Sequence, residues 1–438
     1  MNYSDRAQQE RIFAAFAGPM VTGILGPRRV GKSTLIDHYF SLNPDETVVN
    51  LNMDSMHERE KIKAGLLEDL ILNAIRRHLT PGQRVWVAID EAQKCPELFE
   101  QIKLLYDANK NQNAIKFILT GSALLELHRL SAESLAGRIQ LYYLSAFNLS
   151  EVIHLKHQIK REHTVFDIIQ QNRWDESAWG AYQQQMRPYA TLCATTLDEM
   201  LLWGGLPEAL ISTSNNERLD YLGNYLQTYL EKDVRAIESI TDLNLYRHLM
   251  DIMAEQTGSV RDDQKILQAL ACHRETLNKY RGYLQATLMY QEVYPYINSS
   301  LKRLVKSPKG YLINNGLISF LSGLDDTITL TKTGHIGHRL ENWFLNELHV
   351  WLNKQPGRHD IHYWRTSAGV EVDFIVHRPP YIFPFEVTMS KTIDAKKVKH
   401  LLQFREYEPK AEIVYYIYQG ELRWDAKHKI VFIPAWLI

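Results

Sequence analysis

The chain has 438 residues, of which 45% are hydrophobic and 23% charged, and its formal net charge at pH 7 is −1. This length predicts two or three domains, and the near-zero charge excludes nucleic-acid binding through a global positive field. Cys95, Cys193 and Cys272 lack metal-ligand spacing, which favours reduced thiols over a disulfide framework. No apolar stretch is long enough to cross a bilayer and no signal-like segment opens the chain, so a cytoplasmic protein without membrane contact is expected.

The first predicted element is a strand, loop and helix that together match a phosphate-binding motif. An apolar run at 21–25 leads into a loop that fits G-x-x-x-x-G-K-[ST] at every fixed position. Glycines let backbone N–H groups approach phosphate oxygens, and the helix N-terminus adds its positive dipole end. Lys32 can reach the β- and γ-phosphates, and the Ser33 hydroxyl can ligate Mg²⁺. The residues predicted to bind ATP and Mg²⁺ here are Gly26, Pro27, Arg28, Arg29, Val30, Gly31, Lys32, Ser33 and Thr34.

After this loop, strand-like and helix-like segments alternate along the chain. Strands are expected at 47–51, 84–89 and 116–119, and a helix at 58–78. This alternation predicts an α/β fold in which helices cover a parallel sheet.

Polar residues end two of these strands. Asp90 and Glu91 follow the second strand, and beside a phosphate loop they predict that Asp90 holds Mg²⁺ through water while Glu91 polarises the attacking water. Thr120 ends the third strand and is expected to orient water near the γ-phosphate. Ser122 suits that role and the role of a helix N-cap equally well.

Arg138 precedes the last predicted strand of this sheet, at 139–144. An arginine at this edge of the domain can reach the γ-phosphate of a neighbouring subunit and stabilise transition-state charge, which requires a homo-oligomer. The alternative is a surface arginine that pairs locally.

The order of these features resembles an AAA+ ATPase, and no guanine-selecting N-K-x-D sequence occurs at the usual distance. More closely, the chain is similar to a large prokaryotic family that joins an AAA+ module to a C-terminal domain of unknown function with a restriction-endonuclease-like fold. The resemblance covers most of the chain and is weakest at 155–197, where an insertion is expected, either helical or a loop. It is carried by the sequences GPRRVGKST, AIDEAQKCP, FILTGSALLEL, SLAGRIQLYYLSAFNLSE, LLWGGLPEAL and YLEKDVR.

This resemblance implies four regions along the chain. They are an AAA+ P-loop ATPase core at 1–150, an insertion and helical lid at 151–240, a winged-helix-like region at 241–325 and a PD-(D/E)xK nuclease-like domain at 326–438.

The middle of the chain predicts a winged helix. Helical segments at 264–271 and 274–285 are joined by a turn short enough for a helix-turn-helix, and a β-rich segment at 289–296 with a basic run at 302–309 would supply the wing. If this region binds double-stranded DNA, the second helix presents its polar residues to the major groove and the wing neutralises phosphates. The residues in question are Arg274, Asn278, Lys279, Arg281, Lys302, Arg303, Lys306 and Lys309. Winged helices also serve as protein-packing modules, so both roles stay open.

Acidic residues gather near the end of the chain. A helix is expected at 338–352, with Glu341 near its start, and two strands at 369–376 and 382–388. In the first strand, alternation places Val372, Phe374 and Val376 on one face and Glu371 and Asp373 on the other. Glu386 lies in the second strand, and the acids could converge on one divalent cation, since Mg²⁺ prefers oxygen ligands.

This layout resembles a PD-(D/E)xK nuclease through Glu341, Asp373 and Glu386. Catalytic members require a lysine two residues after the last acid, to assist the water and the developing charge. Thr388 stands there in this chain, and a hydroxyl cannot supply that charge. Lys391 and Lys396 lie further on and would have to take over the role. The domain is therefore expected either to bind without cutting or to be a metal-dependent nuclease.

Three functions fit the sequence. The first is an oligomeric AAA+ ATPase whose nucleotide state drives a C-terminal DNA-handling module of nuclease-like fold. The second is an ATP-dependent switch or scaffold that binds a protein partner without DNA. The third is an active nuclease used in defence or in the control of mobile elements.

Overall fold

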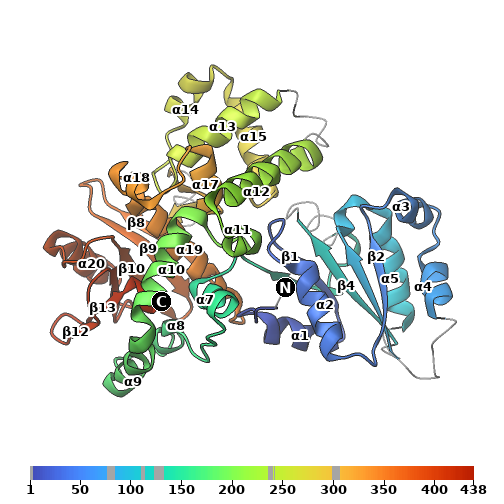
Figure 1. Cartoon of the computed structure of the whole chain (residues 1–438), viewed down its shortest axis with the longest axis horizontal. Coiled ribbons are helices and arrows are strands. Elements are labelled where there is room, and N and C mark those ends of the chain that lie inside the picture. Colours follow the sequence, from blue (N-terminus) through green and yellow to red (C-terminus); the bar gives the residue numbers. More distant parts are fainter. Residues whose placement is uncertain are drawn as a thin grey trace. The chain divides into compact units, whose positions relative to one another are not determined.

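The computed structural model describes residues 3–75, 84–109, 114–122, 133–234, 240, 242–297 and 306–438. The chain divides into two compact units (Figure 1). The N-terminal unit comprises Met1–Ala146 with Gln285–Leu288, and the C-terminal unit comprises Phe147–Leu284 with Met289–Ile438. Among the described residues, none of the helices combines the length and apolar composition that a bilayer span requires.

A five-stranded parallel sheet forms the centre of the N-terminal unit, in the order β2-β3-β4-β1-β5. Every residue of β1 is buried, as expected of a parallel strand covered on both faces. The predicted α/β fold is confirmed. The strands are β1 Val21–Leu25, β2 Thr47–Asn52, β3 Val85–Asp90, β4 Ile115–Gly121 and β5 Ile139–Tyr143. The helices are α1 Gln9–Ala17, α2 Lys32–Leu42, α3 Met56–Lys63, α4 Leu67–Ile75, η1 Ala92–Lys94 and α5 Glu97–Asn109.

The single helix predicted at 58–78 is wrong, because two helices, α3 and α4, lie in this stretch and residues 76–78 fall outside the described part. Gly65 separates the two with φ 80°, a left-handed conformation that a continuing helix does not allow. The predicted ends of the strands agree with the structure more closely than this helix does. The carboxyl ends of β1, β3 and β4 meet at one edge of the sheet, and Gly26, Asp90 and Thr120 lie there.

A mixed eight-stranded sheet runs through the C-terminal unit, in the order β12-β13-β11-β10-β9-β8-β6-β7. Helix α19, Ile336–Asn353, packs against β10, and helix α20, Ala395–Tyr407, packs against β9, β10 and β11. The strands are β6 Tyr290–Pro295, β7 Lys309–Leu312, β8 Asp360–Arg365, β9 Glu371–Arg378, β10 Tyr381–Val387, β11 Val414–Tyr418, β12 Arg423–Asp425 and β13 Ile430–Pro434.

The alternation predicted for β9 is broken in the middle of the strand. Val372 packs with Phe404 of α20, whereas Phe374 and Val376 belong to the core that contains Phe344 of α19. The pairing of β8 with β9 shifts register between His362 and Trp364, where β9 has one extra residue, and such an extra residue turns the following side chains to the other face.

The rest of the C-terminal unit is helical. Its helices are α7 Leu149–His157, α8 Val165–Ile169, α9 Glu176–Met186, η2 Arg187–Tyr189, α10 Ala190–Trp203, α11 Pro207–Ile211, α12 Asn215–Thr228, η3 Tyr229–Val234, α13 Leu243–Glu255, α14 Asp263–Leu270, α15 Arg274–Ala286, α17 Asn315–Leu321, α18 Thr327–Lys332 and η4 Ala435–Leu437. The expected helix-turn-helix pair corresponds to α14 and α15. Strand β6, from the segment expected to supply the wing, pairs antiparallel with β7 and also pairs with β8 of the main sheet. Of the basic run expected at 302–309, residues 302–305 lie outside the described residues, and Lys309 begins β7.

The insertion expected at 155–197 is helical and packs on the C-terminal sheet region. Phe166 stacks on Trp351 of α19 with ring centroids 4.9 Å apart, and Trp174 stacks on Trp424 of β12 at 4.6 Å. Arg161 donates a hydrogen bond to the carbonyl of Ile438 at 3.1 Å. The insertion and the C-terminal sheet therefore share one hydrophobic core.

Candidate functional sites

The loop between β1 and α2 needs glycine at both glycine positions of its motif, Gly26 and Gly31. A Cβ on Gly26 would lie 2.2 Å from the carbonyl oxygen of Leu144, so the two backbones touch only because no side chain intervenes. Gly31 precedes α2 with φ 94°, in the left-handed region. The loop thus has the close backbone approach and the helix start that a phosphate requires.

Lys32 is the first residue of α2 and is buried. Its Nζ donates to the carbonyl oxygens of Gly26 and Pro27, at 2.9 and 3.0 Å. These contacts keep the ammonium inside the curve of the loop, where phosphate oxygens can exchange for the carbonyls.

Asp90 is held between two hydroxyl groups. The Ser33 Oγ on α2 donates to Asp90 Oδ2 at 3.3 Å, and the Thr120 hydroxyl at the end of β4 donates to Asp90 Oδ1. A serine hydroxyl beside a carboxylate is the set of hard oxygen donors that suits Mg²⁺, which usually keeps several waters as well. The residues present therefore fit an Mg²⁺ ion bound with a nucleoside triphosphate.

Glu91 adopts a left-handed backbone conformation, with φ 52° and ψ 44°, which is rare for a residue with a side chain. Its backbone N–H donates to Thr120 Oγ1 at 3.3 Å. Its carboxylate oxygen Oε2 accepts from Ser122 Oγ at 2.9 Å and from Gln93 Nε2 at 2.7 Å. Ser122, for which two roles were open, here orients Glu91, and Gln93 is a partner that the sequence analysis missed.

Arg6 is a second residue that sequence reasoning missed. Its side chain is buried, with Nη1 donating to the Val30 carbonyl at 2.6 Å and Nη2 to the Ser145 carbonyl at 2.7 Å. The guanidinium therefore ties the phosphate loop to the segment that follows β5. No signal in the sequence singles out this arginine, since it belongs to no motif and pairs across 139 residues.

Arg138 is engaged within its own chain. Its Nε and Nη2 donate to the two carboxylate oxygens of Asp107 on α5, at 2.9 and 2.8 Å, and Nη1 donates to the Ala136 carbonyl at 3.2 Å. This geometry corresponds to the local-pairing alternative. A role in trans stays a prediction that would require Arg138 to leave Asp107.

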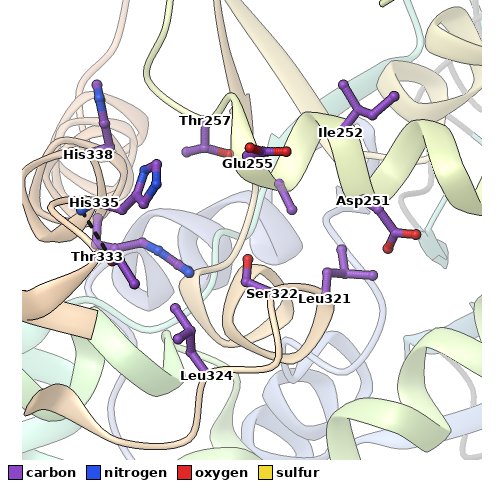
Figure 2. Close-up of a pocket in the computed structure, with 12 residues that line it drawn as sticks. Asp251, Ile252, Glu255, Thr257, Leu321, Ser322, Leu324, Thr333, His335 and His338 are labelled. Carbon is purple, nitrogen blue, oxygen red and sulfur yellow. Dashed lines mark hydrogen bonds between the residues drawn. The ribbon is translucent and has the colours of Figure 1, made fainter. Parts of the chain in front are cut away.

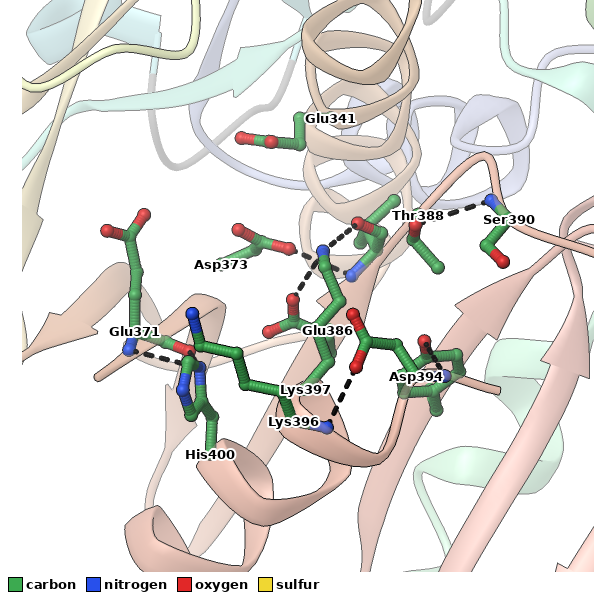
Figure 3. Close-up of polar contacts among 12 residues, drawn as sticks. Glu341, Glu371, Asp373, Glu386, Thr388, Ser390, Asp394, Lys396, Lys397 and His400 are labelled. Atoms are coloured by element: carbon green, nitrogen blue, oxygen red, sulfur yellow. Dashed lines mark hydrogen bonds and ion pairs between the residues drawn. The ribbon is translucent and has the colours of Figure 1, made fainter. Parts of the chain in front are cut away.

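A second cluster of charges lies in the C-terminal unit. The Nζ of Lys309, at the start of β7, lies 2.6 Å from Glu371 Oε1, 3.4 Å from Asp373 Oδ1 and 3.5 Å from Glu341 Oε2. Figure 3 shows these three carboxylates around a common space. Burial opposes the charge of Lys309, but the surrounding carboxylates outweigh it and raise the pKa of the lysine above its usual range.

Glu386 binds a different lysine. Its Oε1 lies 2.7 Å from the Nζ of Lys397, which lies in the first turn of α20 and also donates to the Val387 carbonyl at 3.4 Å (Figure 3). Lys391 and Lys396, the two lysines that the sequence offered in place of the one missing at Thr388, are exposed. The lysine that the fold brings to the last acid is Lys397 instead.

The predicted metal site of Glu341, Asp373 and Glu386 is arranged differently from the prediction. Within the described ranges, no group of three or more His, Cys, Asp and Glu side chains is placed to hold a metal ion. The three acids do lie in one region, but lysine ammonium groups neutralise them, and Glu371 joins them. Burial raises the pKa of Glu341 to about 7, against the opposing effect of Lys309.

A cavity of about 410 Å³ lies beside this cluster (Figure 2). His338 lines it, and the Nδ1 of His338 is 3.8 Å from Glu341 Oε1, so the cavity reaches the edge of the carboxylates. Burial and the nearby Lys309 lower the pKa of His338, which favours the neutral imidazole. The other lining residues are Asp251, Ile252, Ala254, Glu255, Thr257, Leu321, Ser322, Leu324, Thr333, His335 and Arg339.

The structure places some of the residues predicted to contact DNA at the surface and others in the interior. Arg274 and Lys306 line a polar cavity of about 550 Å³, and Lys279 is exposed on α15. Lys302 and Arg303 lie outside the described residues.

Two of the expected DNA contacts are corrected. Lys309 is buried among carboxylates and does not offer its charge at the surface. Arg281 is also buried, with Nη1 2.7 Å from Asp263 Oδ1 and Nη2 donating to Asn278 at 2.6 Å. Both cations satisfy internal acids instead.

Comparison with known proteins places these sites in a wider context. Residues 19–153 match the family model described as an AAA domain. Residues 194–328 match a domain of unknown function (DUF8612), and residues 336–438 match another (DUF4143). The N-terminal unit thus contains an AAA+ ATPase-like domain of the P-loop class.

Two relatives and one solved structure are similar to most of the chain. An uncharacterised protein of Mycobacterium bovis and one of Mycobacterium tuberculosis are each 24% identical to it over 412 residues, which is 94% of this chain and 79% of the relative. A Walker-type ATPase of Pyrococcus abyssi is 17% identical, with a TM-score of 0.47 over 73% of this chain and 96% of that one.

Proposed function

We propose that the N-terminal unit binds and hydrolyses ATP with Mg²⁺, and that its nucleotide state controls a DNA-handling C-terminal unit of nuclease-like fold. The observation that carries the first part is the position of Asp90, bound by the hydroxyls of Ser33 and Thr120 next to Glu91. Motif residues from α2, β3 and β4 therefore meet at one edge of the sheet.

Each of these residues has a chemical task in the proposed reaction. Lys32 places a positive charge against the β- and γ-phosphates, and Ser33 with Asp90 would hold Mg²⁺, which offsets developing phosphate charge when bound. Glu91, oriented by Ser122 and Gln93, accepts a hydrogen bond from the attacking water and aligns it. The Thr120 hydroxyl, through one hydrogen bond to each, fixes the Asp90 carboxylate and the backbone of Glu91 relative to each other.

The test of this proposal is a pair of variants, one at Glu91 and one at its partner Ser122. Glu91→Gln keeps the hydrogen-bonding shape but removes the negative charge, so it should bind ATP normally and turn over at least about 100-fold more slowly. Ser122→Ala, which removes one of the two hydrogen bonds that Glu91 Oε2 accepts, should fall between this variant and the wild type. Normal turnover by Glu91→Gln would remove Glu91 from its role.

The proposal that ATP is hydrolysed between subunits depends on Arg138. The bidentate pair with Asp107 would then be a resting state, exchanged for the γ-phosphate of a neighbour on assembly. Turnover should rise more steeply than linearly with protein concentration, and Arg138→Ala should abolish turnover while ATP binding persists. Full turnover by dilute monomers would refute an oligomeric site.

The DNA-handling role rests on the C-terminal unit. Glu341, Asp373, Glu386 and Lys397 lie in one region, and they are the residue types that a metal-dependent nuclease site combines. The cavity lined by Arg274 and Lys306 offers exposed positive charge nearby in the same unit. DNA binding should weaken as salt increases, and the double variant Arg274→Ala/Lys306→Ala should reduce that salt dependence.

A protein-partner switch is the second candidate, because Lys309 and Arg281 use their charges internally and reduce the basic surface expected for DNA. ATP turnover should be measured with and without double-stranded DNA. Stimulation by DNA favours the DNA-handling module, and indifference at low salt favours a protein partner. Cleavage of DNA with Mg²⁺ or Mn²⁺ that disappears in Asp373→Ala would favour an active nuclease.

A further inference from the structure

Arg339 is a buried arginine without an acidic partner among the described residues. It lies near the start of α19, is 3% exposed and lines the cavity of about 410 Å³, so the small exposed part of its side chain opens into that cavity. Its Nη1 donates to the carbonyl oxygen of Asn315 at 2.7 Å, and its other side-chain nitrogens have no acceptor in the described part of the chain. The guanidinium therefore keeps N–H groups for a further acceptor.

Another buried arginine of the same unit shows what Arg339 lacks. The Nη1 of Arg281 lies 2.7 Å from Asp263 Oδ1, and its Nε lies 3.6 Å from Glu292 Oε1. Such carboxylates compensate the cost of removing a guanidinium from water. Burial, with no acid of the described ranges opposing it, lowers the pKa of Arg339 to about 9. An anion in the cavity would supply the missing compensation.

The side of the cavity near Arg339 favours an anion for a second reason. Helix α19, which is 18 residues long, begins there, and its N-cap residue His335 makes no side-chain hydrogen bond to the first turn. The first turn contains no acidic residue, so the positive end of the helix dipole is not offset there. Figure 2 shows His335, His338 and Thr333 together on this side of the cavity. Imidazole, hydroxyl and guanidinium groups are all suited to an oxyanion.

The other side of the cavity is acidic. Figure 2 shows Asp251 and Ile252, both of α13, across the cavity from His335. Asp251 Oδ1 lies 3.8 Å from the Nε of Arg247, and Glu255 has no ion pair within the described ranges. These carboxylates would repel a second anionic group but accept hydrogen bonds from an amino or hydroxyl group. The volume of the cavity lies within the range of small-molecule sites.

We propose that this cavity binds a small molecule with two different ends. One end is an oxyanion, either a phosphate or a carboxylate, that Arg339 binds at the start of α19. The other end is an amino or hydroxyl group that faces Asp251 and Glu255 of α13. This binding does not depend on the ATP and DNA functions proposed above.

Calorimetric titration of the full chain tests the proposal, with Lys32→Ala in every protein so that the phosphate loop does not bind the probe. Phosphoethanolamine, which carries a phosphate and an amine, should bind at one site per chain. Arg339→Met keeps the apolar stem and removes the charge, so it should weaken binding by about 10- to 100-fold. Arg358→Met, which removes an exposed ion pair with Asp360, is the matched control and should not change the affinity. No binding by the parent protein up to about 10 mM probe, or equal binding by Arg339→Met, would overturn the proposal.

A second variant covers the case in which Arg339→Met does not fold. Ser322 is an exposed C-cap residue of α17 that lines the cavity, so Ser322→Trp should fill the cavity and leave the hydrophobic core intact. This variant should abolish binding of phosphoethanolamine. Unchanged affinity would mean that the probe binds elsewhere, and the cavity would then lose its assigned role.

Two further probes identify the groups of the ligand. β-Alanine replaces the phosphate by a carboxylate and keeps the amine, so the tighter binder of the two identifies the oxyanion that the site prefers. Inorganic phosphate lacks the amine and should bind more weakly than phosphoethanolamine, and Glu255→Gln should reduce this difference. Equal affinity for phosphate and phosphoethanolamine would refute the role assigned to the acids of α13.

Discussion

Replacing Arg6 by methionine should destabilise the phosphate loop, although Arg6 lies 24 residues before Val30 in the sequence. The guanidinium donates to the carbonyls of Val30 and Ser145, at 2.6 and 2.7 Å, from a buried position. Hydrogen bonds from a charged group contribute about 1.5–3 kcal/mol each, and burying the guanidinium takes back part of the sum. We therefore expect Arg6→Met to lower the stability of the N-terminal unit by about 2–4 kcal/mol.

Native-state hydrogen exchange is the appropriate assay, because it reports the stability of the N-terminal unit separately from that of the C-terminal unit. A loss of that size should speed the exchange of the β1 amides, Val21–Leu25, by roughly 30- to 1,000-fold. ATP affinity should fall as well, since the Val30 carbonyl lies in the loop. Lys103→Met, which removes an exposed ion pair with Glu100, is the control and should leave stability nearly unchanged, because solvent screens such a pair. Exchange and ATP affinity of Arg6→Met within about threefold of the wild type would refute the reasoning.

Three further predictions follow from other contacts. Asp107→Asn should release Arg138 from its partner. If Arg138 acts on a neighbouring subunit, ATP turnover should then rise at a lower protein concentration in an ATPase titration. An unchanged titration curve would show that Arg138 has no role between subunits. Trp174→Ala should destabilise the C-terminal unit by about 1–3 kcal/mol, because the ring stacks on Trp424, and a urea titration with an unchanged midpoint would contradict this. Burial raises the pKa of Glu347 to about 8, so folding favours its protonated form. Stability should then fall by up to about 1.4 kcal/mol per pH unit between the usual glutamate pKa and 8, and Glu347→Gln should remove most of this slope in melts across that range.

The arrangement of the motif residues in the N-terminal unit could largely be predicted, because local sequence patterns identify them. The phosphate loop is contiguous, and Asp90 and Thr120 stand where buried strands end, so parallel pairing brings them together. Arg6 could not be found in this way, since its partners are backbone carbonyls far along the chain. Because every residue has a backbone carbonyl, the sequence does not indicate which carbonyl accepts a hydrogen bond.

The C-terminal cluster was predictable only in part. Acids at 341, 373 and 386 were brought to one region by a helix and two adjacent strands, which periodicity can indicate. Lys309 was expected at the surface because it ends a basic run, whereas β7 pairs with β6 at the end of the sheet and the Lys309 side chain reaches the acids of β9. Lys397 was missed because the choice among neighbouring lysines depends on which one faces the sheet from α20.

The insertion has a consequence for any attempt to isolate the C-terminal domain. Tyr182 donates to the carbonyl of Leu437, Arg161 donates to that of Ile438, and Trp174 covers Trp424. A fragment of 326–438 would leave these carbonyls and rings open to water and to other copies of itself, so we expect it to aggregate. A fragment that begins at Phe147, where the C-terminal unit starts, keeps these contacts, so the last strands depend on residues that are translated long before them.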